Sequence, residues 1–69
     1  MKEKVELIVK RGLLTGANLS HMILYRVNLS DADLTGVNLI GTRLYGANIT
    51  GAELFGANLY STILDRLSN

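Results

Sequence analysis

Residues that could perform acid–base, nucleophilic or metal chemistry are few in this sequence. The chain of 69 residues contains a single histidine, His21, and no cysteine. A catalytic nucleophile needs a neighbouring base, and a metal ion needs several His, Cys or carboxylate ligands at suitable spacing. The carboxylates Asp31 and Asp33 follow His21 only ten or more residues later. We therefore expect no catalytic residue, no metal ligand and no cofactor, and we expect that the protein is not an enzyme.

The elements that would position any functional residue follow a five-residue repeat. Large aliphatic residues recur at every fifth position, namely Leu14, Leu19, Leu24, Leu29, Leu34, Leu39, Leu44, Ile49, Leu54, Leu59 and Leu64. The residue two positions earlier is mostly small, as at Ala17 and Ala47, and the last position of the unit is often glycine. Such a fixed period is typical of repeat architectures. Each unit is therefore small, polar, large apolar, then two residues that suit a turn.

This period excludes both an α-helix and a flat strand. A five-residue step advances a helix by about 500°, so the leucines would spread around the cylinder and form no apolar stripe. In a strand an odd repeat would send alternate leucines to opposite faces. All leucines face one side only if the chain bends once in every unit, and glycine accepts the positive φ of such a bend. The repeat therefore predicts a closed coil with corners.

The units resemble those of the pentapeptide-repeat family, which have the form Ala-(Asp/Asn)-Leu-X-X. Eleven consecutive units cover residues 12–66, and Asn18, Asp33 and Asn48 are among those that match the polar position. The polar position departs from that pattern at Leu13, Ile23, Arg43, Glu53 and Ile63. The resemblance implies an all-β solenoid, a right-handed quadrilateral β-helix with four units per coil and just under three coils.

With four units per coil, residues twenty apart stack in columns at about 4.8 Å. Asn18, Asn38 and Asn58 fall in one column, where we expect their amides to bond along the stack. Asp33 and Glu53 share another column, and paired carboxylates can perform acid–base chemistry. A convex side offers no pocket, so we interpret these carboxylates as solvated.

The sequence divides into residues 1–11, the repeats of 12–66 and a tail of 67–69. In the first segment Val5, Ile8 and Val9 have helical spacing, and Glu6 and Lys10 form an i,i+4 pair. A glycine follows, which suits a helix stop. We prefer a short cap helix over the first coil. The alternative is a degenerate twelfth repeat unit, because Leu7 and Val9 also have the inward phase.

The C-terminal coil is the first candidate for association. Repeat arrays need covered ends, and only a short tail follows the last repeat. The leucines that this leaves at the end are Leu54, Leu59, Leu64 and Leu67. We expect a homodimer packed end to end through this coil, which is also how many members of the family close it.

A second candidate is one side of the coil where aliphatic, tyrosine and arginine residues replace the usual polar ones. This surface consists of Ile23, Tyr25, Ile40, Arg43, Tyr45, Tyr60 and Ile63. Such residues are typical of protein interfaces. The alternative is a purely structural role, in which the tyrosines stack as a ladder and the isoleucines are scattered exposed residues.

Composition narrows the choice of partner. The net charge is +1, no run of one sign is present, and no segment is long enough to span a membrane or to be a signal peptide. We expect a cytoplasmic interaction or scaffold module that binds protein partners, with no nucleic acid and no membrane. Some proteins of the family mimic DNA and bind DNA gyrase, but that alternative needs a long, strongly negative rod. A short, near-neutral chain disfavours it.

Overall fold

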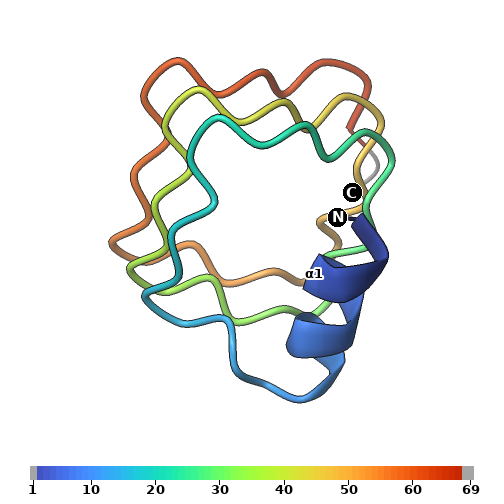
Figure 1. The fold of residues 1–69 in the computed structure, drawn as a ribbon, viewed down its shortest axis with the longest axis vertical. Helices are drawn as coiled ribbons and strands as arrows, with labels where there is room; N and C mark the ends of the chain where they lie inside the picture. The colour runs from blue at the N-terminus through green and yellow to red at the C-terminus, as the bar shows by residue number, and fades with distance from the viewer. Residues whose placement is uncertain (1, 68–69) are drawn as a thin grey trace.

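The computed structural model describes residues 2–67, which form one N-terminal helix followed by a stack of square coils (Figure 1). The helix is α1, Lys2–Lys10. Parallel bridges join residues that are twenty positions apart, and they link Asn18 to Asn38, Ile23 to Arg43, Asn28 to Asn48, Asp33 to Glu53, Asn38 to Asn58 and Arg43 to Ile63. Each coil therefore contains four repeat units, one on each of its sides.

Each corner of a coil is a β-turn. The amide of Val37 donates to the carbonyl of Leu34, three residues earlier, at 3.1 Å. The third residue of this turn, Gly36, has φ of 70°. A positive φ at the third turn residue defines a type II turn, which turns the chain without disturbing the extended segments on either side. The same hydrogen bond recurs in each successive unit, from the Ala17 amide to the Leu14 carbonyl through to the Thr62 amide and the Leu59 carbonyl.

Neighbouring coils are joined by parallel hydrogen bonds. The Leu19 amide donates to the Asn38 carbonyl at 2.8 Å, and the Asn38 amide donates to the Ala17 carbonyl at 2.9 Å. Each side of a coil contributes only one bridged residue, because the corners follow after about three extended residues. The structure is consequently a β-helix in which the described residues form isolated bridges rather than long strands.

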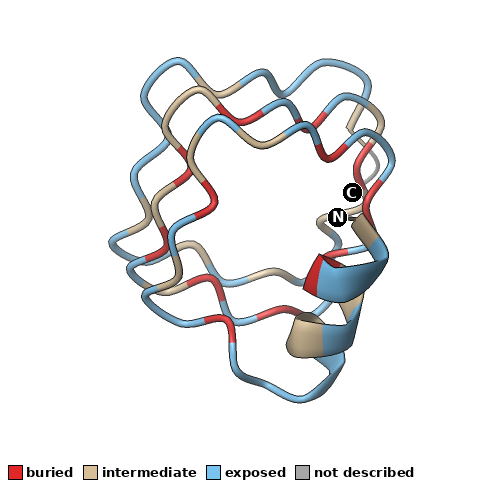
Figure 2. Ribbon diagram, viewed as in Figure 1, coloured by how far each residue is buried: buried red, intermediate tan, exposed pale blue. Residues whose placement is uncertain are grey.

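The leucine positions fill the interior of the stack. Leu24, Leu29 and Leu34 are completely buried, and buried residues line the inside of the coils in Figure 2. The wall also contains buried Thr42, whose hydroxyl donates to the Leu19 carbonyl at 2.7 Å. This bond satisfies the hydroxyl inside an apolar core, where an unpaired polar group would cost about 1–3 kcal/mol.

Helix α1 covers the beginning of the stack and contributes to the same core. Val5 is buried, and Ile8 and Val9 pack against the core leucines. The side chain of Glu6 accepts a hydrogen bond from the backbone amide of Asn28 at 2.7 Å. In the next coil the corresponding amide, that of Asn48, donates to a backbone carbonyl. Glu6 thus replaces the coil that would otherwise precede Asn28.

The C-terminus of α1 is a Schellman motif. The amide of Leu13 donates to the carbonyl of Ile8 at 3.1 Å, the amide of Gly12 donates to that of Val9 at 2.9 Å, and Gly12 has φ of 70°. Glycine is favoured at this position because it has no Cβ to clash in the left-handed conformation. The predicted N-terminal helix is confirmed, and the alternative of a twelfth repeat unit is wrong.

Helix α1, nine residues long, is the only helix between residues 2 and 67, and it is too short to cross a membrane.

At three of the four corners, a residue with a side chain in the first coil is followed by glycine in the second. His21, Arg26 and Asp31 occupy corners of the first coil with φ near 60°. Glycine occupies the same corners one coil later, and a Cβ at Gly41 would stand 2.5 Å from the His21 Nδ1 atom. The side chains of His21, Arg26 and Asp31 therefore lie against the second coil, in the space that a Cβ would fill if the glycine above each of them were another residue.

A reciprocal pair of substitutions tests the corner strain. Ser61 has φ of 57°, so Ser61→Gly should raise the free energy of unfolding by about 1 kcal/mol. Gly36→Ser should lower this free energy by a similar amount, because a side chain is strained at the positive φ of Gly36. No clash adds to that strain, since a Cβ there would meet only the Gly16 backbone, at an ordinary 3.8 Å. Urea unfolding followed by circular dichroism measures both. Effects of the same sign in the two variants would contradict the role assigned to the corners.

Candidate functional site

The few residues with acid–base capacity lie on the outside of the coils. His21 is exposed at a corner, and Asp33 and Glu53 are exposed one above the other on the side formed by residues 12–16, 32–36 and 52–56. We call this the acidic side. No group of three or more His, Cys, Asp or Glu residues that could hold a metal ion occurs within residues 2–67.

Asp33 has a local structural partner. Its Oδ1 atom accepts hydrogen bonds from the Thr35 hydroxyl and from the Thr35 backbone amide, at 2.5 and 3.0 Å. The hydroxyl bond and then the amide bond stabilise the ionised form, so they hold the pKa of Asp33 below its ordinary value of 3.8. The carboxylate acts as a turn cap in its own unit.

The asparagines at the polar position act in the same way. Asn18 Oδ1 accepts from the Ser20 amide at 3.0 Å and from its hydroxyl at 2.6 Å, and the amide of Ile40 donates to Asn38 at 3.0 Å. We expected amide bonds along the column, but these oxygen atoms bind within their own unit instead. The reason is geometric, since a short Asx side chain reaches the amide two residues on with little strain.

Three units on one side have lost this cap. Their polar positions are Ile23, Arg43 and Ile63, which stack in one column through parallel bridges. We call the side formed by residues 22–26, 42–46 and 62–66 the tyrosine side. Neither an aliphatic group nor a guanidinium can accept a hydrogen bond from the following turn, so these residues do not serve the fold as asparagine does. Their outward side chains are available for contacts.

The tyrosine side presents a continuous set of exposed apolar groups. Ile23, Tyr25, Tyr45 and Ile63 are all exposed. The rings of Tyr25 and Tyr45 lie one above the other with centroids 6.1 Å apart and planes at 80°, an edge-to-face pair. This geometry lets the two rings contact each other and still present apolar surface, so the predicted column is present with tilted rather than parallel rings.

The remaining predicted surface residues lie around the neighbouring corner and differ from one another. Ile40 is only partly exposed, whereas Tyr60, twenty residues later in the same column, is 74 % exposed. Ile40 therefore offers less surface than we predicted, because Tyr60 follows it in the stack. Tyr60 extends the exposed apolar surface toward the C-terminal coil.

Burial falls sharply in the last coil. Leu39 is 1 % exposed, whereas Leu59 in the same column is 38 % exposed and Leu64 is 42 % exposed. Leu54 and Leu67 are partly buried against the core. Within residues 2–67 the amides of Leu54, Leu59 and Leu64 have no acceptor in a following coil. The C-terminal coil therefore combines exposed leucines with an open sheet edge. Residues 68 and 69 of the predicted tail lie outside the described residues.

Two features were missed by the sequence analysis. Phe55 is 85 % exposed on the acidic side, at a position that threonine occupies in the two earlier coils. The second feature is a hollow of about 300 Å³ between α1 and the first coil, lined by Glu6, Val9, Lys10, Asn28 and Ser30. Phe55 could have been noticed as an apolar residue at a turn position, whereas the hollow depends on where α1 docks.

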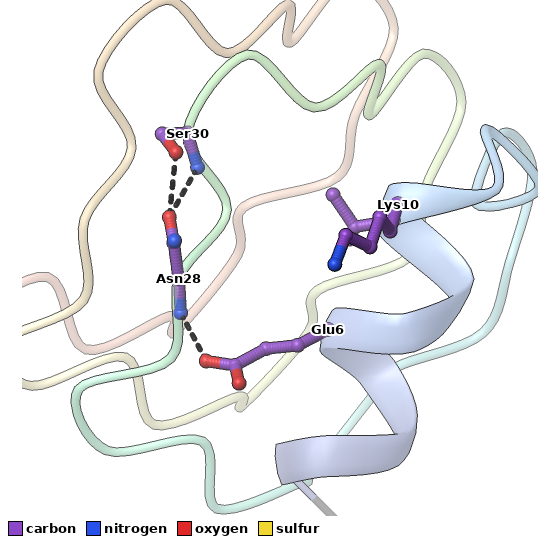
Figure 3. A pocket seen from close by; sticks show the side chains of 5 residues that line it. Glu6, Lys10, Asn28 and Ser30 are labelled. Carbon is purple, nitrogen blue, oxygen red and sulfur yellow. Dashed lines mark hydrogen bonds between the residues drawn. The ribbon is translucent and has the colours of Figure 1, made fainter.

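The hollow beside α1 does not assemble a reactive group. Figure 3 shows Glu6 pointing toward Asn28, whose amide it binds, and Asn28 bonding to Ser30. Lys10 also points toward the hollow, and it is the second charged residue that lines it. Because Glu6 is already engaged by the backbone, the arrangement closes the first coil rather than preparing a catalytic base.

The geometry defines a class of protein: a quadrilateral β-helical solenoid with exposed apolar groups on its sides and at its C-terminal end. Comparison with family models agrees, since the model described as Pentapeptide repeats matches residues 13–51 in eight copies. The chain belongs to the pentapeptide-repeat family. No curated protein matches the chain in a sequence search.

The Asp33 cap makes a prediction about pH. A carboxyl with a lowered pKa in the folded state stabilises the protein above its unfolded pKa, and this contribution is lost as the pH falls through the folded value. Asp33→Asn should keep the same acceptor, so it should fold normally at neutral pH. As the pH falls below 3.8, the free energy of unfolding of the wild type should decrease relative to that of Asp33→Asn. Urea unfolding across pH measures this, and a constant difference would contradict it.

Proposed function

We propose that the protein is a non-enzymatic protein–protein interaction or scaffold module and a subunit of a larger assembly. The observation that carries this proposal is the continuous exposure of Ile23, Tyr25, Tyr45 and Ile63 on one side. A regular β-helix provides a rigid surface, so a partner can bind without ordering the backbone first. We place the module in the cytoplasm on the basis of its composition.

The scaffold itself is inferred to be a right-handed coil of just under three turns, as the family resemblance implies. Such a solenoid depends on contacts between neighbouring coils, and its ends need cover. Helix α1 covers the first coil, so head-to-tail stacking of copies would meet the helix. Pairing of two C-terminal coils avoids it and gives a closed, two-fold dimer.

The homodimer is therefore the second part of the proposal. Leu59 and Leu64 would lose their solvent contact in it, and burial of apolar surface contributes about 25 cal/mol per Å². The open amides of the last coil would also gain partners or be shielded, which removes an exposed sheet edge.

Mimicry of DNA, the alternative function, receives no support from the charge distribution. The repeats carry Asp31, Asp33, Glu53 and Asp65 against Arg26, Arg43 and Arg66. A DNA-like rod requires closely spaced negative charges along its whole surface. The molecule is short, with principal extents of 25 × 21 × 19 Å.

Charge introduced at the C-terminal end should separate the dimer. We expect the wild type to sediment as a dimer at micromolar concentration and Leu59→Asp as a folded monomer, because a buried carboxylate would lack a partner. Leu13→Asp is the matched control, since Leu13 is 68 % exposed and lies in the first coil, at the other end of the stack. A wild type that sediments as a monomer would refute the dimer.

Loss of the apolar groups from the tyrosine side should remove partner binding. We expect the double variant Tyr45→Ser, Ile63→Ser to lose at least one protein that the wild type captures, as measured by quantitative mass spectrometry. Asp33→Asn with Glu53→Gln changes the opposite side and should capture the same protein as the wild type. Equal capture by all three proteins, each shown to be folded by circular dichroism, would refute the role of the tyrosine side.

A further inference from the structure

We infer that the tyrosine side binds an acidic segment of its partner, one that carries aspartate or glutamate next to apolar residues. This inference rests on the proposed interaction function and specifies the chemistry of the partner. It comes from how charge is divided among the sides of the coil, a property that net charge alone does not show.

Opposite sides of the coil carry opposite charge. The tyrosine side contains Arg26, Arg43 and Arg66 against a single Asp65. The acidic side, ten residues away along the chain and so across the coil, contains Asp33 and Glu53 and no basic residue. An approaching acidic segment is attracted to the first side and repelled by the second. Charge arranged in this way sets the orientation of binding and raises its rate.

The arginines are free to bind a partner. Arg26, Arg43 and Arg66 are all exposed, and none of them is paired with a carboxylate within residues 2–67. A guanidinium group binds a carboxylate through two parallel hydrogen bonds, which gives direction as well as attraction. The side therefore has three unoccupied groups of the kind that recognises Asp or Glu.

The apolar groups lie among these arginines. Ile23 and Ile63 occupy the same column as Arg43, one coil before and one coil after it. The Tyr25 and Tyr45 pair lies two residues further along each coil, next to the corner that Arg26 occupies. Tyrosine and arginine are the residues that most often dominate binding energy at interfaces. Apolar contact would exclude water and strengthen the neighbouring ion pairs.

The same observations disfavour a nucleic acid as the occupant. Affinity for nucleic acid comes largely from many basic contacts with phosphates, and here three are present. The exposed side chains of Ile23 and Ile63 would also make better contact with an apolar side chain of a peptide than with a charged sugar–phosphate backbone.

The experiment is a selection from a random peptide library displayed on phage, with the full chain immobilised. Selected peptides are then synthesised with a fluorophore, and binding is measured by anisotropy at about 50 mM and about 300 mM salt, concentrations between which screening rises strongly. We expect peptides rich in Asp and Glu with apolar neighbours. Their affinity should fall at the higher salt concentration.

Variants assign the binding to a side. Arg43→Glu should weaken binding by at least about tenfold, because it replaces attraction by repulsion at the centre of the side. Tyr45→Ser with Ile63→Ser should also weaken it, whereas Asp33→Asn with Glu53→Gln should leave it unchanged or slightly stronger. Circular dichroism and urea unfolding establish that each variant is folded, and Arg43→Gln serves as a milder second variant.

The outcomes distinguish the inference of an acidic partner from the proposed interaction function of the tyrosine side. Peptides without acidic residues that still require Tyr45 and Ile63 would overturn the acidic partner and leave the interaction surface standing. Peptides insensitive to every variant of the tyrosine side, or a failure to select any peptide, would overturn both. A single-stranded oligothymidylate that binds more tightly than the peptides would replace the protein partner by a nucleic acid.

Discussion

The whole structure depends on one backbone constraint, a left-handed residue at every fifth position. It closes each type II turn, points each leucine inward and brings residues twenty apart into parallel hydrogen bonds. Glycine satisfies the constraint at Gly36 without strain, whereas His21 adopts it at a cost of about 1 kcal/mol that packing must offset. The buried leucines and the bonds between coils supply that compensation, so neither the corners nor the core would persist alone.

Because the backbone repeats so closely, individuality is confined to the outward side chains. Most of these still serve the fold, as Asn18 and Asp33 do when they cap the turn two residues on. The positions that do not cap a turn, such as Ile23 and Ile63, are therefore the informative ones. Ile23, Arg43 and Ile63 gather on one side, together with arginines that have no carboxylate partner within the described chain, whereas Leu13 and Glu53 lie on the acidic side. This concentration is the observation on which the proposed interaction surface rests.

Much of the fold could be predicted from the sequence because the period fixes the phase of every residue. The inward leucines and the Tyr25–Tyr45 column follow directly from counting, and the cap helix follows from the spacing of Val5 and Ile8. Counting could not show that Glu6 binds the Asn28 amide, since that bond depends on how α1 docks. It also could not show that the first-coil corner side chains lean over glycine, because side-chain direction is set by the local φ. The roles of the predicted surface and of the dimer end stay predictions.

The four-sided register has a consequence for how such a chain can change its length. Insertion of a single repeat unit would rotate all later units by a quarter turn, so Tyr45 would no longer lie above Tyr25 and the acidic and basic residues would be mixed on each side. Insertion of twenty residues would preserve every column and lengthen each side by one layer, about 4.8 Å. Whole coils, rather than single repeats, are therefore the units in which this surface can grow or shrink without losing its pattern.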